Sequence, residues 1–221
     1  MRMVTCVIGM LFVAGAAAAG EAAKPVVPEE KIVLFNGTDF TGWVKFCPKK
    51  GADVDKIWTV RDGVIHCLGK PHGYIRTEQD YANYRLHVEW RWTAKPTNSG
   101  VLLHKQGPDR VWPKCVEAQL KHHNAGDFWL LTKSTITVNG KQVGPKMYAN
   151  AKKRGDHNEK PPGEWNAYDI TCDGDTVRLV VNGRVMNEGT DAEPSSGAIC
   201  LQSEGSPIEF RNVYLQPLKE K

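Results

Sequence analysis

The stretch Tyr84-Arg85-Leu86-His87-Val88-Glu89-Trp90-Arg91-Trp92 alternates apolar and polar side chains without a break. Because successive side chains of a β-strand point to opposite faces, the pattern predicts an antiparallel strand with one face in the core. Leu86, Val88 and Trp90 are expected to be buried, with the charged residues and the histidine of this stretch on the opposite face. Trp92 is expected to be the exception, since it lies at the strand end, where the sheet face opens.

Short strands of this kind recur along the chain, and no long helical period interrupts them. The turns between them contain Gly, Asn and Asp, and the Asp62-Gly63 and Asn182-Gly183 steps are typical of hairpins. The pattern therefore predicts an all-β sandwich, with residues 24–221 forming one domain. The polar segment 141–163 is expected to be a long surface insertion.

Residues 1–23 have the features of a cleaved signal peptide. Arg2 precedes an apolar run over residues 7–13, and small residues follow at 14–19. This run is too short for a membrane span, and no other stretch is apolar enough to cross a bilayer. We therefore expect a periplasmic or secreted protein without stable membrane insertion.

The charge balance is mild, because 29 basic and 25 acidic residues give a formal net charge of +4. The basic residues are scattered apart from Lys152-Lys153-Arg154, which argues against a nucleic-acid partner.

An odd number of cysteines remains after the signal peptide, so at least one thiol is unpaired within the chain. These cysteines are Cys47, Cys67, Cys115, Cys172 and Cys200. The sequence fixes neither their pairing nor the oligomeric state of the protein, and their spacing does not resemble a zinc site.

The alternation of side chains in residues 114–131 predicts two strands, separated by a turn at 124–127. His122 and His123 come just before this turn and are expected on the loop surface. The first strand would be apolar on one face, whereas its other face would carry Cys115, Glu117, Gln119 and Lys121. That polar face suits either bulk solvent or the lining of a sugar cleft.

Short motifs follow one another in a fixed order over about residues 31–218: Leu34-Phe35-Asn36-Gly37, Asn98-Ser99-Gly100-Val101, Glu117-Ala118-Gln119, Pro162-Gly163-Glu164-Trp165-Asn166 and Leu201-Gln202-Ser203-Glu204-Gly205. In this order they resemble the bacterial 3-keto-disaccharide hydrolase family. The resemblance implies a concanavalin A-like jelly roll of two curved antiparallel sheets, with a sugar on the concave face. It also implies action on 3-keto glycosides as a 1,2-lyase, as a hydratase of the resulting 2-hydroxy-glucal, or as both. The stretch Leu120–Asp127 differs from the aspartate-bearing stretch of much of the family, which puts the substrate in doubt.

A ketone at C3 acidifies the proton at C2, so a base can remove this proton and the group at C1 can then leave. Such a site needs a base, donors for the enolate oxygen and an acid for the leaving oxygen. We expect catalytic roles for Glu117, His104 and Glu204. Glu117 would be the base, which a nearby Lys121 keeps ionised while partial burial raises its pKa toward the working pH. The expected substrate-binding residues are Gln119, Lys121, Gln202, Arg211 and Trp129, and the side chains of Trp112 and Tyr148 would also suit stacking on a sugar.

Other interpretations remain open. A divalent metal ion that polarises the ketone could be bound by His104, Glu117 and a histidine of the His122-His123 pair, although nothing in the spacing requires one. His104 is predicted on the same face as Leu102. No other cofactor is implied. The alternatives to the keto-glycoside enzyme are a lectin-like carbohydrate-binding domain without catalysis, and a conventional glycoside hydrolase that uses Glu117 and Glu204 as its two carboxylates.

Overall fold

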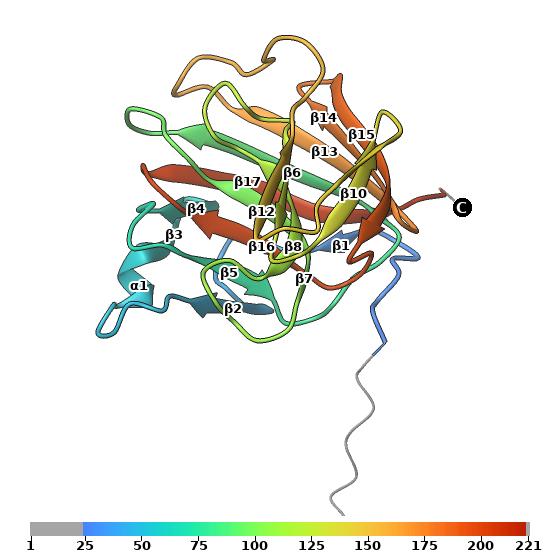
Figure 1. Ribbon diagram of the computed structural model, residues 1–221. Coiled ribbons are helices and arrows are strands. Elements are labelled where there is room, and N and C mark those ends of the chain that lie inside the picture. Colours follow the sequence, from blue (N-terminus) through green and yellow to red (C-terminus); the bar gives the residue numbers. More distant parts are fainter. Residues whose placement is uncertain (1–23, 220–221) are drawn as a thin grey trace, which may run out of the picture.

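The structure is a computed structural model that describes residues 24–219, and its two antiparallel β-sheets pack face to face in a jelly roll (Figure 1). The expected signal peptide lies outside the described residues. The short helix α1 (Val54–Ile57) begins after Asp53, whose carboxylate accepts a hydrogen bond from the backbone N–H of Asp55. In this part of the chain no helix is long and apolar enough to cross a membrane.

The larger sheet is centred on β6 (Tyr84–Trp92), which pairs with β13 (Asn166–Asp173) on one side and β17 (Ile208–Pro217) on the other. Beyond β13 follow β14 (Thr176–Val181), β15 (Arg184–Glu193), β10 (Thr135–Val138) and β11 (Lys141–Val143). Beyond β17 lie β4 (Val64–Cys67), β3 (Trp58–Arg61) and the short β1 (Ile32–Val33).

The smaller sheet carries the candidate site. Its strands, in spatial order, are β12 (Tyr148–Ala151), β9 (Phe128–Leu131), β8 (Lys114–Gln119), β7 (Gly100–Gln106), β16 (Ala198–Ser203), β5 (Gly73–Thr77) and β2 (Trp43–Phe46). The expected surface insertion at 141–163 is only partly a loop, because it contributes β11 to the edge of one sheet and β12 to the edge of the other.

The pattern that predicts β6 is confirmed along its whole length. Leu86, Val88 and Trp90 are buried between the sheets, while the alternate side chains are partly exposed on the outer face. The expectation that Trp92 is the exception is wrong, since its side chain is only 2% exposed. The reason is non-local: β17 pairs with β6 as far as Trp92, opposite Ile208, so the core face does not open at this end.

Apolar side chains occupy both faces of the smaller sheet. One face packs into the core between the sheets, where Val116 and Ala118 of β8 lie. On the other face, a second apolar cluster is separate from this core and is formed by Tyr74, Leu102, Cys115, Leu131 and Cys200. We call it the outer cluster. Cys115 is thus a buried hydrophobe, and the five cysteines of residues 24–219 are all free thiols.

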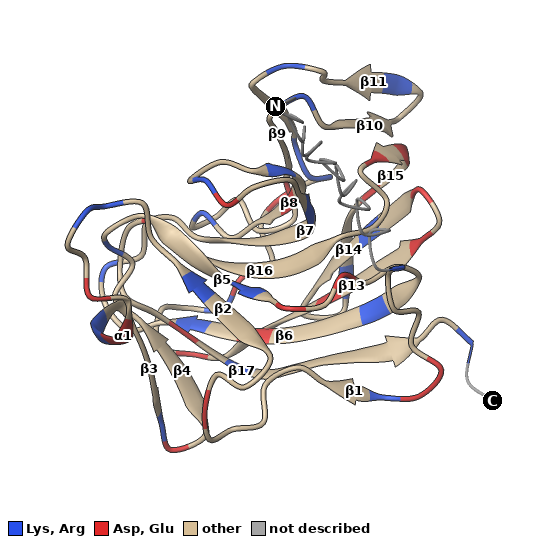
Figure 2. Cartoon of the chain, turned by 90° about the horizontal axis from the view of Figure 1, so that it is seen from below, with Lys and Arg blue, Asp and Glu red and all other residues tan. Residues whose placement is uncertain are grey.

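Charged residues of both signs are interspersed over the sheets and loops, without a basic stripe in the described part of the chain (Figure 2). On the outer face of the larger sheet they form close pairs. Arg91 lies 2.6 Å from Glu209, and Nδ1 of His87 lies 2.7 Å from Asp169. This pairing of opposite charges is typical of the solvated face of a sheet.

Candidate active site

A pocket of about 290 Å³ opens on the outer face of the smaller sheet. Its walls come from β8, β9, β12 and the loops around them: Asn98, Trp112, Glu117, Gln119, Lys121, Trp129, Leu131, Tyr148 and Glu204. The volume lies near the lower end of the range for small-molecule sites. One side of the pocket carries carboxyl, amide and ammonium groups and the other is aromatic and aliphatic, an arrangement that suits a ligand with both polar and apolar surfaces.

Glu117 of β8 is the most buried carboxyl group of the pocket, with only 3% of the residue exposed. Its Oε1 atom has no hydrogen-bond partner. Burial, and then the nearby negative charge of Glu204, raises the pKa of Glu117 well above its usual value, which favours the protonated form of this carboxyl group. The expected rise of this pKa by burial is therefore confirmed in direction. The expectation that Lys121 keeps Glu117 ionised is wrong, because Lys121 is not among the groups that shift this pKa.

Glu204 lies in the loop that follows β16 and is only partly buried. Burial raises the pKa of Glu204 to about 7, against the opposing effects of the Asn98 side chain and the positive charge of Lys121. Lys121 thus acts on Glu204. The pocket holds one carboxyl group whose burial favours the protonated form and a second whose pKa lies near neutrality, which is how acid and base roles are divided in many active sites.

Gly100 of β7 makes room for the Glu117 carboxyl group. It pairs with Gln119 in the β7–β8 ladder, and a Cβ atom on Gly100 would lie 2.3 Å from Oε1 of Glu117. Its backbone is not in the left-handed region, so the requirement for glycine here is one of space.

We expect Gly100→Ala to leave the fold intact and to lower activity on the substrate by about a hundredfold, because displacing a catalytic group by about an ångström has an effect of this size. Steady-state kinetics, with circular dichroism as the control for folding, measures this. Combining it with Glu117→Asp, whose shorter side chain relieves the contact, should give a smaller loss than the product of the two single losses. Multiplicative losses would show that Gly100 does not act through Glu117.

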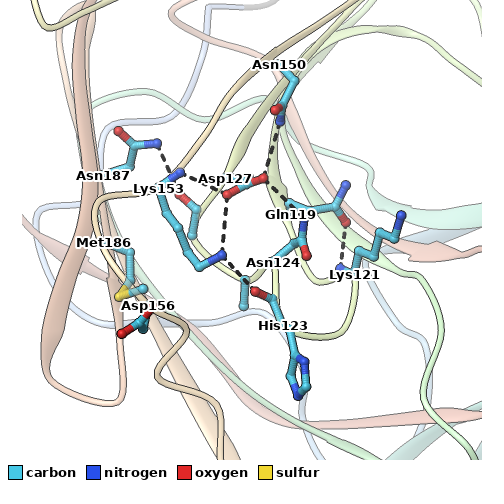
Figure 3. Close-up of polar contacts among 12 residues, drawn as sticks. Gln119, Lys121, His123, Asn124, Asp127, Asn150, Lys153, Asp156, Met186 and Asn187 are labelled. Atoms are coloured by element: carbon cyan, nitrogen blue, oxygen red, sulfur yellow. Dashed lines mark hydrogen bonds and ion pairs between the residues drawn. The ribbon is translucent and has the colours of Figure 1, made fainter.

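Two glutamines lie on the same face of the sheet. The side-chain oxygen of Gln119 accepts hydrogen bonds from the backbone N–H groups of Leu120 (2.9 Å) and Lys121 (2.7 Å), which fixes its amide at the pocket wall (Figure 3). Gln202 of β16 lies opposite Tyr74 of β5 in the strand register. Its side chain is buried, and neither the nitrogen nor the oxygen of its amide has a hydrogen-bond partner. Oδ1 of Asn98 is also buried without a partner. Each such atom costs about 1–3 kcal/mol, which a ligand rich in hydroxyl groups would recover.

The loop between β8 and β9 is held by Asp127 and Lys153. The backbone N–H of Lys153 donates to Oδ1 of Asp127 (2.9 Å), and Nζ of Lys153 donates to the carbonyl oxygen of His123 (2.7 Å) (Figure 3). These contacts position Lys121 at the pocket rim. His122 and His123 do not line the pocket, and the His123 ring stacks on His157 with centroids 4.0 Å apart.

The structure does not bring His104 to the pocket. A register shift in β7 breaks the strand alternation, and His104 has a φ of +58°. Its ring therefore turns to the core side, 5.5 Å from the ring of Tyr84 on β6, whereas Leu102 stays on the outer face. His104 and Glu117 lie on opposite faces of the sheet and cannot bind one metal ion together. Within residues 24–219 no group of three or more potential ligands is placed to hold one.

Burial lowers the pKa of His104 from 6.5 to about 4. Between these values the unfolded chain binds a proton that the folded chain does not, so the free energy of unfolding should fall on acidification by on the order of 3 kcal/mol from this residue. His104→Asn removes the titrating group and tolerates the positive φ. We expect a shallower loss of stability between pH 6.5 and 4 in urea unfolding of the variant. Parallel pH profiles for the two proteins would refute this assignment.

Arg211 also lies away from the pocket. It belongs to β17 of the larger sheet, where its Nε donates to Oε2 of Glu89 (2.6 Å) and its guanidinium group stacks 4.1 Å from the centre of the Trp165 ring. Of the predicted residues, the pocket instead brings together Glu117, Gln119, Lys121, Trp112, Trp129, Tyr148 and Glu204. Gln202 is not among its lining residues. Asn98, Gly100 and Leu131 were not predicted. Asn98 and Gly100 belong to the motif Asn98-Ser99-Gly100-Val101, so the sequence did contain a signal for them.

Buried carboxyl and amide groups beside aromatic rings on the face of a jelly-roll sheet suit a carbohydrate ligand. Comparison with known proteins supports a carbohydrate ligand. The sequence matches the 3-keto-alpha-glucoside-1,2-lyase-like domain over residues 30–216, and the chain belongs to this family. A search of curated proteins gives no match.

Solved structures share the fold. A protein from Parabacteroides distasonis described as a glycosyl hydrolase is 28% identical, with a TM-score of 0.61 over 86% of this chain and 95% of that chain. The carbohydrate-binding module CBM66 from Bacillus subtilis is 11% identical, with a TM-score of 0.55 over 79% and 95%. The Bacillus licheniformis β-glucanase is 13% identical, with a TM-score of 0.55 over 85% and 97%. The last two similarities concern the fold alone.

Proposed function

We propose that the protein cleaves 3-keto glycosides by elimination across C1 and C2, followed by addition of water to the resulting enone. The observation that carries this proposal is a pair of carboxyl groups in one pocket: Glu117, whose burial raises its pKa well above the usual value, and Glu204, whose pKa burial raises to about 7. Family membership supports the substrate class. The signal-peptide features of residues 1–23 support an exported enzyme.

In the elimination step the ionised Glu204 removes the C2 proton, and the electron pair of the C–H bond forms an enolate with the C3 oxygen. The O–H group of Glu117 donates a hydrogen bond to that oxygen and stabilises its developing charge, as a neutral carboxylic acid can do at neutral pH. The C1–O bond then breaks, and the proton on Glu204 passes to the leaving oxygen.

Hydration reverses the proton movements. Glu204 takes a proton from the water that attacks C1, and the new enolate collects this proton at C2. One carboxyl group thus serves as base and acid in both steps, and Lys121 favours its ionised form at the start of each cycle.

Incubation with a 3-keto glucoside and with its parent glucoside tests the proposal. Turnover of only the keto sugar is the expected result. Turnover of the parent glucoside would instead identify a conventional glycoside hydrolase that uses the same two carboxyl groups. Binding of either sugar without turnover would identify a carbohydrate-binding domain. Each of these two outcomes overturns the proposal.

A further inference from the structure

The apolar half of the pocket has no role in the chemistry above. Trp112, Leu131 and Tyr148 form this half. Leu131 belongs to the outer cluster, and the partly buried Trp112 packs against the same cluster. The rings of Trp112 and Tyr148 meet edge to face with centroids 6.5 Å apart. None of these three side chains is charged, so this half of the pocket is an apolar wall with two rings set at right angles.

This wall continues onto the protein surface. Tyr148 is 48% exposed and the adjacent Met147 is 53% exposed, two of the few large hydrophobic side chains that the described part of the chain leaves in contact with solvent. Apolar side chains that continue directly from a pocket are typical of a ligand-binding surface.

The mouth of the pocket is also fixed in place. Oγ1 of Thr132 donates a hydrogen bond to the carbonyl oxygen of Trp112 (2.7 Å), and the backbone N–H of Thr132 donates to the carbonyl oxygen of Met147 (2.8 Å). Thr132 therefore ties the loop that carries Trp112 to the segment that leads into β12. A preorganised apolar wall of this kind loses little conformational entropy when a ligand binds.

The two halves of the pocket place different demands on a ligand. The ketone and the sugar hydroxyl groups need the donors and acceptors of Asn98, Glu117 and Gln119, so the sugar ring occupies the polar half. The group on C1 then extends toward Tyr148 and Trp112. A second sugar there would bring hydroxyl groups against walls that offer them few partners, whereas an aromatic ring would bury its surface against both side chains.

We propose that the pocket formed by Trp112, Leu131 and Tyr148 is a subsite for an aromatic aglycone, so that the preferred substrates are aryl or arylalkyl 3-keto glucosides. This inference rests on the proposed function, because it assumes that the sugar occupies the carboxyl half of the pocket. It adds the chemical class of the leaving group, which the reaction itself does not specify.

Benzyl and methyl 3-keto glucosides, each as α and β anomers, provide the test. Their leaving alcohols are similar in basicity, so the aromatic ring is the main difference between them. We expect kcat/KM for the benzyl compound to exceed that for the methyl compound by at least about tenfold, the effect of burying part of one ring. Tyr148→Ala and Trp112→Ala should each bring this ratio close to one, whereas Leu68→Ala, which shortens an exposed side chain outside this pocket, should leave it unchanged.

Equal kcat/KM values for the two glucosides, or a ratio that survives both pocket substitutions, would overturn the subsite. Calorimetric binding of the parent benzyl and methyl glucosides gives a readout that does not depend on catalysis. Tighter binding of the benzyl compound that is lost in Tyr148→Ala supports the subsite even if no keto sugar is turned over. In that case the proposed reaction fails and the subsite stands. Equal binding together with equal turnover removes the subsite and leaves the reaction in place.

Discussion

Glu117→Ala is expected to lower kcat/KM for a 3-keto glycoside by roughly a hundredfold to a thousandfold, the usual effect of removing one donor to a developing oxyanion. Glu117→Gln is expected to cost only about tenfold, because the amide N–H still donates to the C3 oxygen. The reason for this difference is the burial of Glu117, which raises the pKa of its carboxyl group and favours the protonated form that donates the hydrogen bond. Kinetics of the three proteins at neutral pH measures it.

The same pair of variants separates two roles for Glu117. If it were the base, as the sequence motif predicts, glutamine would abolish proton removal as fully as alanine does. Equal losses of a hundredfold or more in both variants would therefore contradict the donor role. Circular dichroism and the melting temperature serve as the control, since neither substitution removes an internal hydrogen bond of Oε1.

Glu204→Gln is expected to lower kcat/KM by about a hundredfold to ten-thousandfold, the range for lost general base catalysis. In the wild type, kcat/KM should rise about tenfold per pH unit below pH 7 and level off above it, because burial raises the pKa of Glu204 to about 7 and the ionised form is the active one. The rising limb should be absent from the residual activity of Glu204→Gln.

Lys121→Met gives the matched control for this pH dependence. The positive charge of Lys121 lowers the pKa of Glu204, so removing the charge should move the rising limb to higher pH and leave the activity on the plateau less affected. If the rise of kcat/KM near pH 7 persists in Glu204→Gln, or does not move in Lys121→Met, a group other than Glu204 controls the pH dependence.

Local sequence patterns were enough to predict an all-β sandwich and the polar face of β8, whereas the jelly roll and the sugar site were implied by the family resemblance. The alternation in β6 and in β8 follows from the two-residue period of a strand, so Leu86, Val88, Glu117 and Gln119 lie on the faces expected for them. A strand period holds only while the ladder is regular. The shift in β7 that turns His104 into the core depends on its pairing with both neighbouring strands, which the local pattern does not reveal.

The remaining differences have the same non-local origin. Trp92 is buried because β17 continues beside it, and Arg211 lies far from the pocket because β17 belongs to the other sheet. The protonation of Glu117 depends on how deeply the carboxyl group is buried and on which groups surround it. Those surroundings include Gly100 and Glu204, which come together only in the folded sheet.

The fate of the hydrogen at C2 tests the proposed reaction most directly. A 3-keto glycoside labelled with deuterium at C2 would be converted in ordinary water, with the uncatalysed exchange measured in parallel. Elimination followed by hydration predicts that the released keto sugar has lost its deuterium, because Glu204 removes the label and a proton derived from water takes its place. Release of the sugar with the C2 deuterium retained would show direct hydrolysis at C1 and would contradict the account.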